Sequence, residues 1–268
     1  MKFALPLRAI VLGLTLLFGV LLSSCSLLPE QKDETGNWSV ERIFSTGREA
    51  MQEGNYLRAI KMFESLESRF PYGPYAQQSL LLLAYSNYKL GEMATAISAA
   101  DRFIKQYPNH QSVDYAYYLK GLANFNEDFG FLTWLAAQDL SERDPKTLRE
   151  SYTAFRDLVA KFPESRYATD SKLRMNFLVN ALATGEVHVA RYYYERGAYV
   201  AAASRAQAAV LTYPTAPATE EALWLMVAAY DRMNMNALRD DAKRVLTKNY
   251  PQSKYLSGDT GSRWWKFW

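Results

Sequence analysis

The stretch Asn55–Pro71, with the sequence NYLRAIKMFESLESRFP, decides the fold of this chain. Its apolar side chains Ala59, Phe63 and Leu66 return every three or four positions, which is the spacing of one face of an α-helix. Pro71 stops the helix because proline lacks the N–H that another turn would need. The stretch therefore predicts a helix with one buried face that ends at an aromatic residue followed by proline.

The same aromatic–proline ending recurs along the chain. The five occurrences are Phe70-Pro71, Tyr107-Pro108, Phe162-Pro163, Tyr213-Pro214 and Tyr250-Pro251. Gly54, Gly91 and Gly197 each stand at the same distance before one of these endings. A glycine there can end an earlier helix in the left-handed conformation. Each unit is therefore predicted to hold two helices joined by a short turn.

This pattern resembles the tetratricopeptide repeat, a unit of two helices and about 34 residues with small residues where the helices meet. The resemblance implies an all-α fold of five tetratricopeptide-like helix pairs, stacked in a right-handed superhelix. One pair cannot bury its apolar face alone, so neighbouring pairs share a core. An unrelated all-helical bundle is the alternative.

Two segments depart from the repeat. Residues 126–145 form an apolar insertion in the third unit, which we expect to fold as an extra helix or loop against that unit. Residues 167–195 contain no proline and keep a helical periodicity. They therefore predict an unusually long first helix in the fourth unit.

The first 24 residues have the features of a secretory signal. Lys2 and Arg8 precede an apolar run from Ala9 to Leu22, and the small residues Ser23 and Ser24 follow it. The run is shorter than the roughly 20 residues that span a bilayer. Residues 1–24 are therefore predicted to be a signal peptide that is removed.

Leu22-Ser23-Ser24-Cys25 resembles the bacterial lipobox, which implies that a lipid is attached to Cys25 and that the chain is cleaved before it. Cys25 is the single cysteine of the sequence, so no internal disulfide can form. In lipoproteins, the Ser26 that follows implies sorting to the outer membrane. Residues 25–37 are then the lipidated N-terminus and a flexible tether. A secreted protein with a chance cysteine is the alternative.

Composition excludes some functions. The formal net charge is +3 over 268 residues, and this near balance argues against binding to nucleic acid. The two histidines, His110 and His188, are far apart, whereas a zinc site needs three or four clustered ligands. Motifs of hydrolases, nucleotide-binding proteins and metalloproteases are missing. We expect no enzyme, no metal and no cofactor apart from the lipid on Cys25.

The first helices of the units should line the inner face of the stack. Helical positions place seven residues on this groove: Phe44, Arg48, Met51, Tyr85, Tyr88, Tyr118 and Phe125. An aromatic groove with a few polar groups suits an extended peptide or an amphipathic segment. The alternative is that some of these tyrosines pack between units.

Four further motifs resemble the BamD family, the five-repeat lipoproteins of the outer-membrane β-barrel assembly machinery. They are Asp139–Pro145 (DLSERDP), Phe162–Tyr167 (FPESRY), Tyr194–Ala198 (YERGA) and Met233–Ala237 (MNMNA). The resemblance covers about residues 38–251 and the lipobox. It implies a non-catalytic scaffold, anchored by its lipid to the periplasmic face of the outer membrane, that aids folding and insertion of β-barrel proteins.

The resemblance also implies partners. Residues 38–163, the first three repeats, would receive unfolded outer-membrane proteins in the groove. Residues 164–256, the last two repeats, would dock the periplasmic domains of the barrel insertase, and accessory lipoproteins would bind too. Glu195 and Arg196 are implied in docking the insertase. Arg196 has a second explanation, because a cation at a helix C-terminus is favoured by the helix dipole.

Two alternatives stay open. A periplasmic repeat lipoprotein that coordinates cell-wall synthesis or division would have the same composition and repeats. The basic aromatic tail, residues 257–268, includes Trp264, Trp265 and Trp268. It suits a membrane interface or a partner, and it can equally fold back on the fifth repeat or stay disordered.

Overall fold

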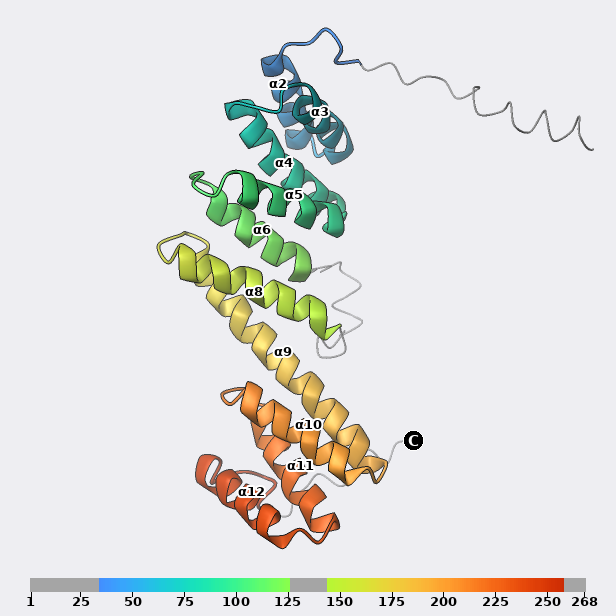
Figure 1. Cartoon of the computed structure of the whole chain (residues 1–268), viewed down its shortest axis with the longest axis vertical. Helices are drawn as coiled ribbons and strands as arrows, with labels where there is room; N and C mark the ends of the chain where they lie inside the picture. The colour runs from blue at the N-terminus through green and yellow to red at the C-terminus, as the bar shows by residue number, and fades with distance from the viewer. Residues whose placement is uncertain (1–33, 126–143, 258–268) are drawn as a thin grey trace, which may run out of the picture. The chain divides into compact units, whose positions relative to one another are not determined.

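A computed structural model describes residues 34–125 and 144–257 (Figure 1). Contacts divide the chain into residues 1–39 and residues 40–268, and all the helices described lie in the second unit. The helices are α2 (Val40–Gln52), α3 (Tyr56–Arg69), α4 (Pro74–Leu90), α5 (Met93–Gln106), α6 (Val113–Phe125), α8 (Pro145–Lys161), α9 (Ala168–Glu195), α10 (Tyr199–Thr212), α11 (Thr219–Arg232) and α12 (Asn236–Asn249). The described ranges contain no strand, and the all-α prediction is confirmed.

Helices pack chiefly on their neighbours in the chain. The pairs are α2 with α3, α4 with α5, α6 with α8, α9 with α10, and α11 with α12, and each pair also contacts the next. This order is consistent with five repeats that share one continuous core. The right-handed superhelix stays a prediction.

The second helix of every pair ends in the same way. The residues that follow these helices are Phe70, Tyr107, Phe162, Tyr213 and Tyr250, and their φ angles lie between −128° and −133°. Each donates its N–H to the carbonyl four residues earlier, at 2.8–2.9 Å. The proline that comes next cannot donate, so the helix stops there.

Left-handed residues end the first helices of four pairs. Gly54, Gly91 and Gly197 have φ angles of 77°, 88° and 76°, which confirms the predicted turns. Asn234 stands at the corresponding place in the last pair with a φ of 57°. Asparagine is among the few residues with a Cβ that accept this conformation readily.

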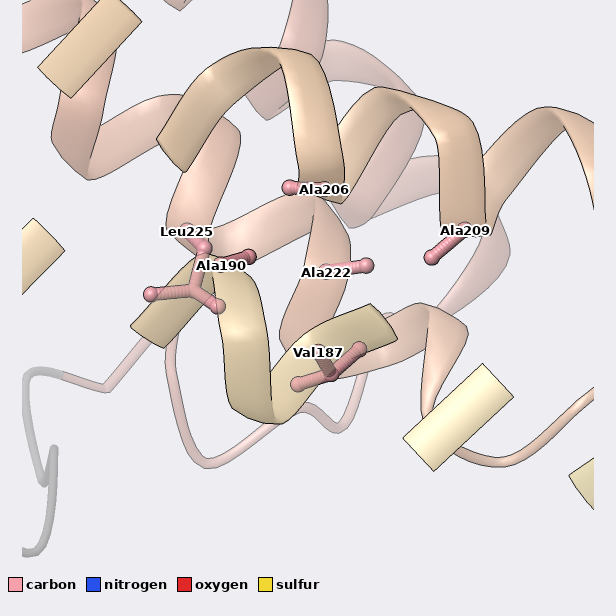
Figure 2. Close-up of a cluster of buried hydrophobic side chains, with 6 residues drawn as sticks. All are labelled: Val187, Ala190, Ala206, Ala209, Ala222 and Leu225. Carbon is pink, nitrogen blue, oxygen red and sulfur yellow. The ribbon is translucent and has the colours of Figure 1, made fainter. Parts of the chain in front are cut away.

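Small side chains let the helices approach closely. Figure 2 shows one such cluster, where α9, α10 and α11 meet through Val187, Ala190, Ala206, Ala209, Ala222 and Leu225. None of these side chains is more than 1% exposed. Alanines bring the helix backbones together, and this gives the junction its close packing.

Helix α9 links the third pair to the fifth. It has 28 residues and confirms the predicted long helix. Its length is about 42 Å at the usual rise per residue. It packs on α8, on α10 and on α11 (Figure 1). Its last residue is Glu195, one of the two predicted docking residues.

Some predictions lie outside the described residues. They concern the signal peptide, the lipidation of Cys25, most of the insertion 126–145 and nearly all of the tail 257–268. The domain boundaries at residues 38, 164 and 257 also stay predictions. Among the described helices, none is both long and apolar enough to cross a membrane.

Candidate functional site: a pocket between the first helices

A pocket of about 630 Å³ lies between the first helices of the first three pairs and the turn before α9. Its wall comes from α2, α4, α6 and the turns that precede α6 and α9. The lining residues are Met51, Leu81, Leu82, Tyr85, Gln111, Ser112, Asp114, Tyr115, Arg166 and Tyr167. The lining therefore combines apolar, aromatic and charged side chains.

Two hydrogen bonds hold the Asp114 carboxylate in place. Its Oδ1 accepts the N–H of Tyr115 at 2.8 Å, and its Oδ2 accepts the hydroxyl of Ser165 at 2.6 Å. Ser165 belongs to the turn before α9, so these bonds tie that turn to the start of α6. The carboxylate consequently closes the pocket wall between the two elements.

Arg166 lies flat against Tyr167. Its guanidinium is 4.7 Å from the centre of the Tyr167 ring, and its Nη2 donates to the Tyr167 hydroxyl. Arg166 is exposed, so its remaining N–H groups face solvent at the pocket mouth. This arrangement offers a cation and several donors to a carboxylate or to backbone carbonyls.

Behind Tyr167, Tyr118 supports the wall. The Tyr118 hydroxyl donates to Asp170 Oδ2 at 2.8 Å, and Arg174 Nε donates to the same oxygen at 2.6 Å. Burial, followed by the hydrogen bond to Asp170, raises the pKa of Tyr118 to about 12. Tyr118 therefore stays protonated and keeps donating across the physiological range.

Tyrosines in and beside the pocket pack against one another in pairs. The rings of Tyr56 and Tyr85 meet edge to face with centroids 6.3 Å apart. Burial, and then the charge and hydrogen bond of Tyr56, raise the pKa of Tyr85. Burial, and then neighbouring tyrosines, also raise the pKa of Tyr115 well above its ordinary value. At neutral pH Tyr85 and Tyr115 are therefore uncharged, and they give the pocket aromatic faces and hydroxyl groups.

The pocket is suited to binding. Aromatic faces and hydroxyls take apolar or aromatic side chains, while Arg166 and Asp114 provide polar contacts for a peptide main chain.

His110 has a structural role, because its Nδ1 accepts the N–H of Ser112 at 3.1 Å. Within residues 34–125 and 144–257 no three His, Cys, Asp or Glu side chains form a metal site.

The structure brings only part of the predicted groove together. Met51 and Tyr85 line the pocket. Tyr118 stands behind Tyr167, and Tyr88 is half-buried. Arg48 is exposed, with its guanidinium 6.0 Å from the ring of Phe44, and it does not line the pocket.

Two predicted groove residues lie in the core instead. Phe44 is 7% exposed and packs on Phe63 and Tyr75. Phe125 is 5% exposed and packs against Phe177. Both stabilise the helices that form the wall, so neither can offer its face to a ligand in this conformation.

Other pocket residues were missed by the sequence analysis. Asp114 and Tyr115 follow the turn after Tyr107, and Arg166 and Tyr167 belong to the turn after Phe162. Each of these turns leads into the first helix of a pair, and the side chains named here line the pocket. Their position in the sequence, four or more residues after the aromatic residue of an aromatic–proline ending, is the signal that could have identified them.

The predicted docking residues lie at the other end of α9. Glu195 is its last residue and Arg196 follows it, and both are exposed. The Arg196 guanidinium is 5.3 Å from the ring of Tyr192, which is 54% exposed. Val200, at the start of α10, is 71% exposed. An exposed cation and apolar groups thus gather at this turn.

Comparisons with known proteins agree along nearly the whole chain. Residues 37–245 match the family model YfiO, described as outer membrane lipoprotein. An outer membrane protein assembly factor BamD of Neisseria meningitidis serogroup B is 44% identical over 261 residues, which are 95% of this chain and 98% of that protein. The BamD proteins of Xylella fastidiosa (strain Temecula1) and Vibrio cholerae are 37% and 32% identical, over 92% and 89% of this chain and 83% and 96% of theirs.

Solved structures give a weaker likeness. A thermophilic TPR protein of Thermus thermophilus is 16% identical, with a TM-score of 0.37 over 82% of this chain and 98% of that one. At that score the likeness supports no statement about function.

Proposed function

The chain belongs to the YfiO family of outer membrane lipoproteins, and from this membership we propose that it is a non-catalytic scaffold in the assembly of outer-membrane β-barrel proteins. The observation on which the proposal rests is the match, along almost the full chain, to proteins named outer membrane protein assembly factor BamD. The pocket supports a binding role, because its aromatic and polar groups suit a polypeptide segment.

The pocket would receive segments of unfolded barrel proteins. Such segments are extended and alternate apolar with polar side chains. An apolar or aromatic side chain would enter between Met51 and Tyr85, and carbonyl or carboxylate oxygens would meet Arg166. Because the raised pKa values of Tyr85 and Tyr115 keep both side chains uncharged at neutral pH, their contact with the segment would depend little on pH near 7.

The last two pairs would dock the periplasmic domains of the barrel insertase. The turn between α9 and α10 offers Arg196, Tyr192 and Val200 on an exposed surface. Aromatic residues and arginine are enriched at the centres of protein interfaces. Accessory lipoproteins would bind elsewhere on the same stack, and a lipid on Cys25 would hold the protein at the periplasmic face of the outer membrane.

Gentle isolation from membranes tests the scaffold role. The full chain is recovered through an affinity tag, and its companions are identified by mass spectrometry. We expect an outer-membrane protein with periplasmic repeats and a C-terminal barrel, in near-equal amount. Recovery of cell-wall synthases or division proteins in its place would contradict the proposal and favour the cell-wall alternative.

A labelled peptide tests the pocket separately. The probe copies the last strand of an outer-membrane barrel, and its binding is followed by fluorescence anisotropy. Tyr85→Ala is compared with Tyr72→Ala, since Tyr72 is 90% exposed and does not line the pocket. We expect Tyr85→Ala to weaken binding about tenfold and Tyr72→Ala to leave it unchanged. Equal binding by both variants would exclude this pocket as the peptide site.

A further inference from the structure

The turn that follows α12 repeats the turn that begins α9. Three hydrogen bonds define the earlier turn: Ser165 N–H to the Phe162 carbonyl at 3.0 Å, Ala168 N–H to the Ser165 carbonyl at 2.9 Å, and Tyr167 N–H to the Ser165 hydroxyl at 3.2 Å. The corresponding bonds in the later turn are Ser253 to Tyr250 at 3.0 Å, Leu256 to Ser253 at 3.0 Å, and Tyr255 to the Ser253 hydroxyl at 3.3 Å. The two turns therefore share one backbone design.

Both turns also dock on the preceding first helix through the same aromatic stack. Tyr167 stacks on Tyr118 with centroids 4.6 Å apart and planes at 19°. Tyr255 stacks on Trp224 with centroids 5.0 Å apart and planes at 20°. Tyr118 and Trp224 occupy the same position, the sixth residue, in α6 and α11. The turn after α12 is thus placed as if another first helix were to follow.

The described chain provides no helix at that place, and α12 shows the consequence. Lys243 stands at the position that is Phe63, Ala100, Phe155 and Ala206 in α3, α5, α8 and α10, and those four side chains are 0% exposed. Phe155 is buried with residues of α6 and α9, and Ala206 with residues of α9 and α11, so each lies between its own first helix and the next one. Lys243 is exposed instead, so the contact face for a following helix lies open.

A shallow groove of about 510 Å³ runs along this face. It is lined by Asp240, Lys243, Arg244, Thr247 and Lys248. Arg244 is paired with Asp241 at 2.9 Å and Asp240 with Arg239 at 2.8 Å, which leaves Lys243 and Lys248 as the main charges that an occupant would meet. The groove therefore favours a negatively charged occupant.

We propose that this face binds an acidic helix of a partner protein, which takes the position of a further first helix. The occupant is a helix because the repeated turn and the open face reproduce a helix-binding position. It is acidic because lysines line the groove. The chain's own residues 258–268 fit poorly, since Arg263 and Lys266 have the same charge as the groove and Asp259 is the single acid there. This inference goes beyond the proposed function and does not depend on the pocket.

Photo-crosslinking in intact cells tests the proposal with the full, membrane-attached protein. Benzoylphenylalanine replaces Thr247, which is exposed and uncharged, and a matched protein carries it at the exposed Thr153 of α8. Crosslinked peptides are sequenced by mass spectrometry. We expect Thr247, and not Thr153, to capture one segment of a partner that is rich in Asp and Glu and has helical periodicity.

Charge reversal gives the second readout. Lys243→Glu with Lys248→Glu is compared with Lys61→Glu with Lys105→Glu, which changes the net charge equally on the exposed surfaces of α3 and α5. We expect the first pair to reduce the Thr247 crosslink about tenfold and the second pair to leave it unchanged. Circular dichroism checks that both remain folded.

Any of the following results would overturn the proposal. The first is a Thr247 crosslink to residues 258–268 of the same chain, which would make the tail the occupant. The second is a crosslink to lipid alone. The third is an equal effect of the two charge-reversed pairs, or no crosslink at all, which would make the polar face of α12 a solvated end of the stack.

Discussion

The ring of Tyr167 stacks on the ring of Tyr118, with centroids 4.6 Å apart and planes inclined at 19°. Tyr167 lines the pocket and immediately precedes α9, whereas Tyr118 belongs to α6. The Tyr118 hydroxyl also donates to Asp170 in the first turn of α9. Through these two contacts, Tyr118 fixes both the pocket wall and the start of the helix that leads to Arg196.

Tyr118→Phe should destabilise the protein more at neutral pH than in acid. The variant keeps the ring stack and loses the hydrogen bond to Asp170, which costs about 1 kcal/mol in the free energy of unfolding. Burial raises the pKa of Asp170, but hydrogen bonds from Arg174 and Tyr118 outweigh burial and lower this pKa below its ordinary value. That stabilisation is present above pH 4 and is lost as the pH falls through the folded pKa.

Urea unfolding at pH 7 and at pH 3 measures this difference. Tyr117→Phe is the control, because the Tyr117 hydroxyl accepts from exposed Lys161 at 2.6 Å and a surface contact of this kind contributes little. The difference between wild type and Tyr118→Phe should narrow in acid. A constant difference at both pH values would show that Asp170 is not the partner that matters.

Gly121→Ala should disrupt the packing of α6 on α8. A Cβ at Gly121 would lie 2.5 Å from Cε1 of Phe155, which is fully buried. We expect a loss of about 1–3 kcal/mol in the free energy of unfolding, because the ring must move in a packed core. In a Phe155→Leu background the same change should cost clearly less.

Thermal or urea unfolding measures these losses of stability. Gly54→Ala provides the control. No atom lies within 4 Å of a Cβ at Gly54, but its φ of +77° is unfavourable for alanine. Its cost, about 1 kcal/mol, should be the same in both backgrounds. Equal costs of Gly121→Ala with and without Phe155 would refute the close contact.

Arg166→Lys should weaken peptide binding although the charge is kept. Lysine cannot lie flat on Tyr167 or present the planar guanidinium, so the cation is placed less well. With the barrel-strand peptide described above, we expect several-fold weaker binding for Arg166→Lys and a larger loss for Arg166→Ala. Binding by Arg166→Lys as tight as wild type would mean that only the charge is used.

Tyr255→Ala should loosen the end of the described chain. Tyr255 stacks on Trp224 and hydrogen-bonds to Glu221, which also accepts Arg191 Nε at 2.8 Å. Its removal should increase amide exchange in α11 and α12, whereas Tyr255→Phe, which keeps the stack, should change it less. Hydrogen–deuterium exchange with mass spectrometry measures this, and exchange unchanged by Tyr255→Ala would contradict it.

Tyr255 should also contribute to stability loss in alkali. Burial, followed by the charge of Glu221, raises its pKa from 10 to about 12 in the folded protein. A raised folded pKa gives stability that is complete below pH 10 and is lost as the pH rises towards 12. Tyr255→Phe should therefore lose less stability than wild type between pH 8 and pH 11.

The alkaline difference should be below about 1 kcal/mol, because solvent screens a side chain that is only partly buried. Urea unfolding at the two pH values measures it. A larger alkaline loss in Tyr255→Phe than in wild type would have the wrong sign and would exclude this contribution.

The repeat could be predicted from sequence because its signals are local. The stop at Phe70-Pro71, the left-handed turn at Gly54 and the helical spacing of Ala59 and Phe63 each depend on a few neighbouring residues. Backbone geometry and the missing proline N–H act within one turn of helix. The helix pairs and the long α9 followed from such signals alone.

The pocket could be predicted only in part. Helical position places Met51 and Tyr85 on the inner side, and there they line the pocket. The same reasoning placed Phe44 and Phe125 beside them, yet both are buried against neighbouring helices. Position along one helix cannot show whether a side chain faces the groove or the next helix, because these two sides lie next to each other around the helix axis.

By itself, then, the sequence determined the all-α repeat, the points at which the helices begin and end, and the length of α9. Tertiary structure alone decided that Arg166 and Tyr167 close a pocket begun by α2, and that α12 exposes Lys243 where other pairs bury a side chain. Helix ends depend on bonds between near neighbours. A pocket wall or an open face depends on how successive pairs stack, and that is set by packing between residues far apart in the chain.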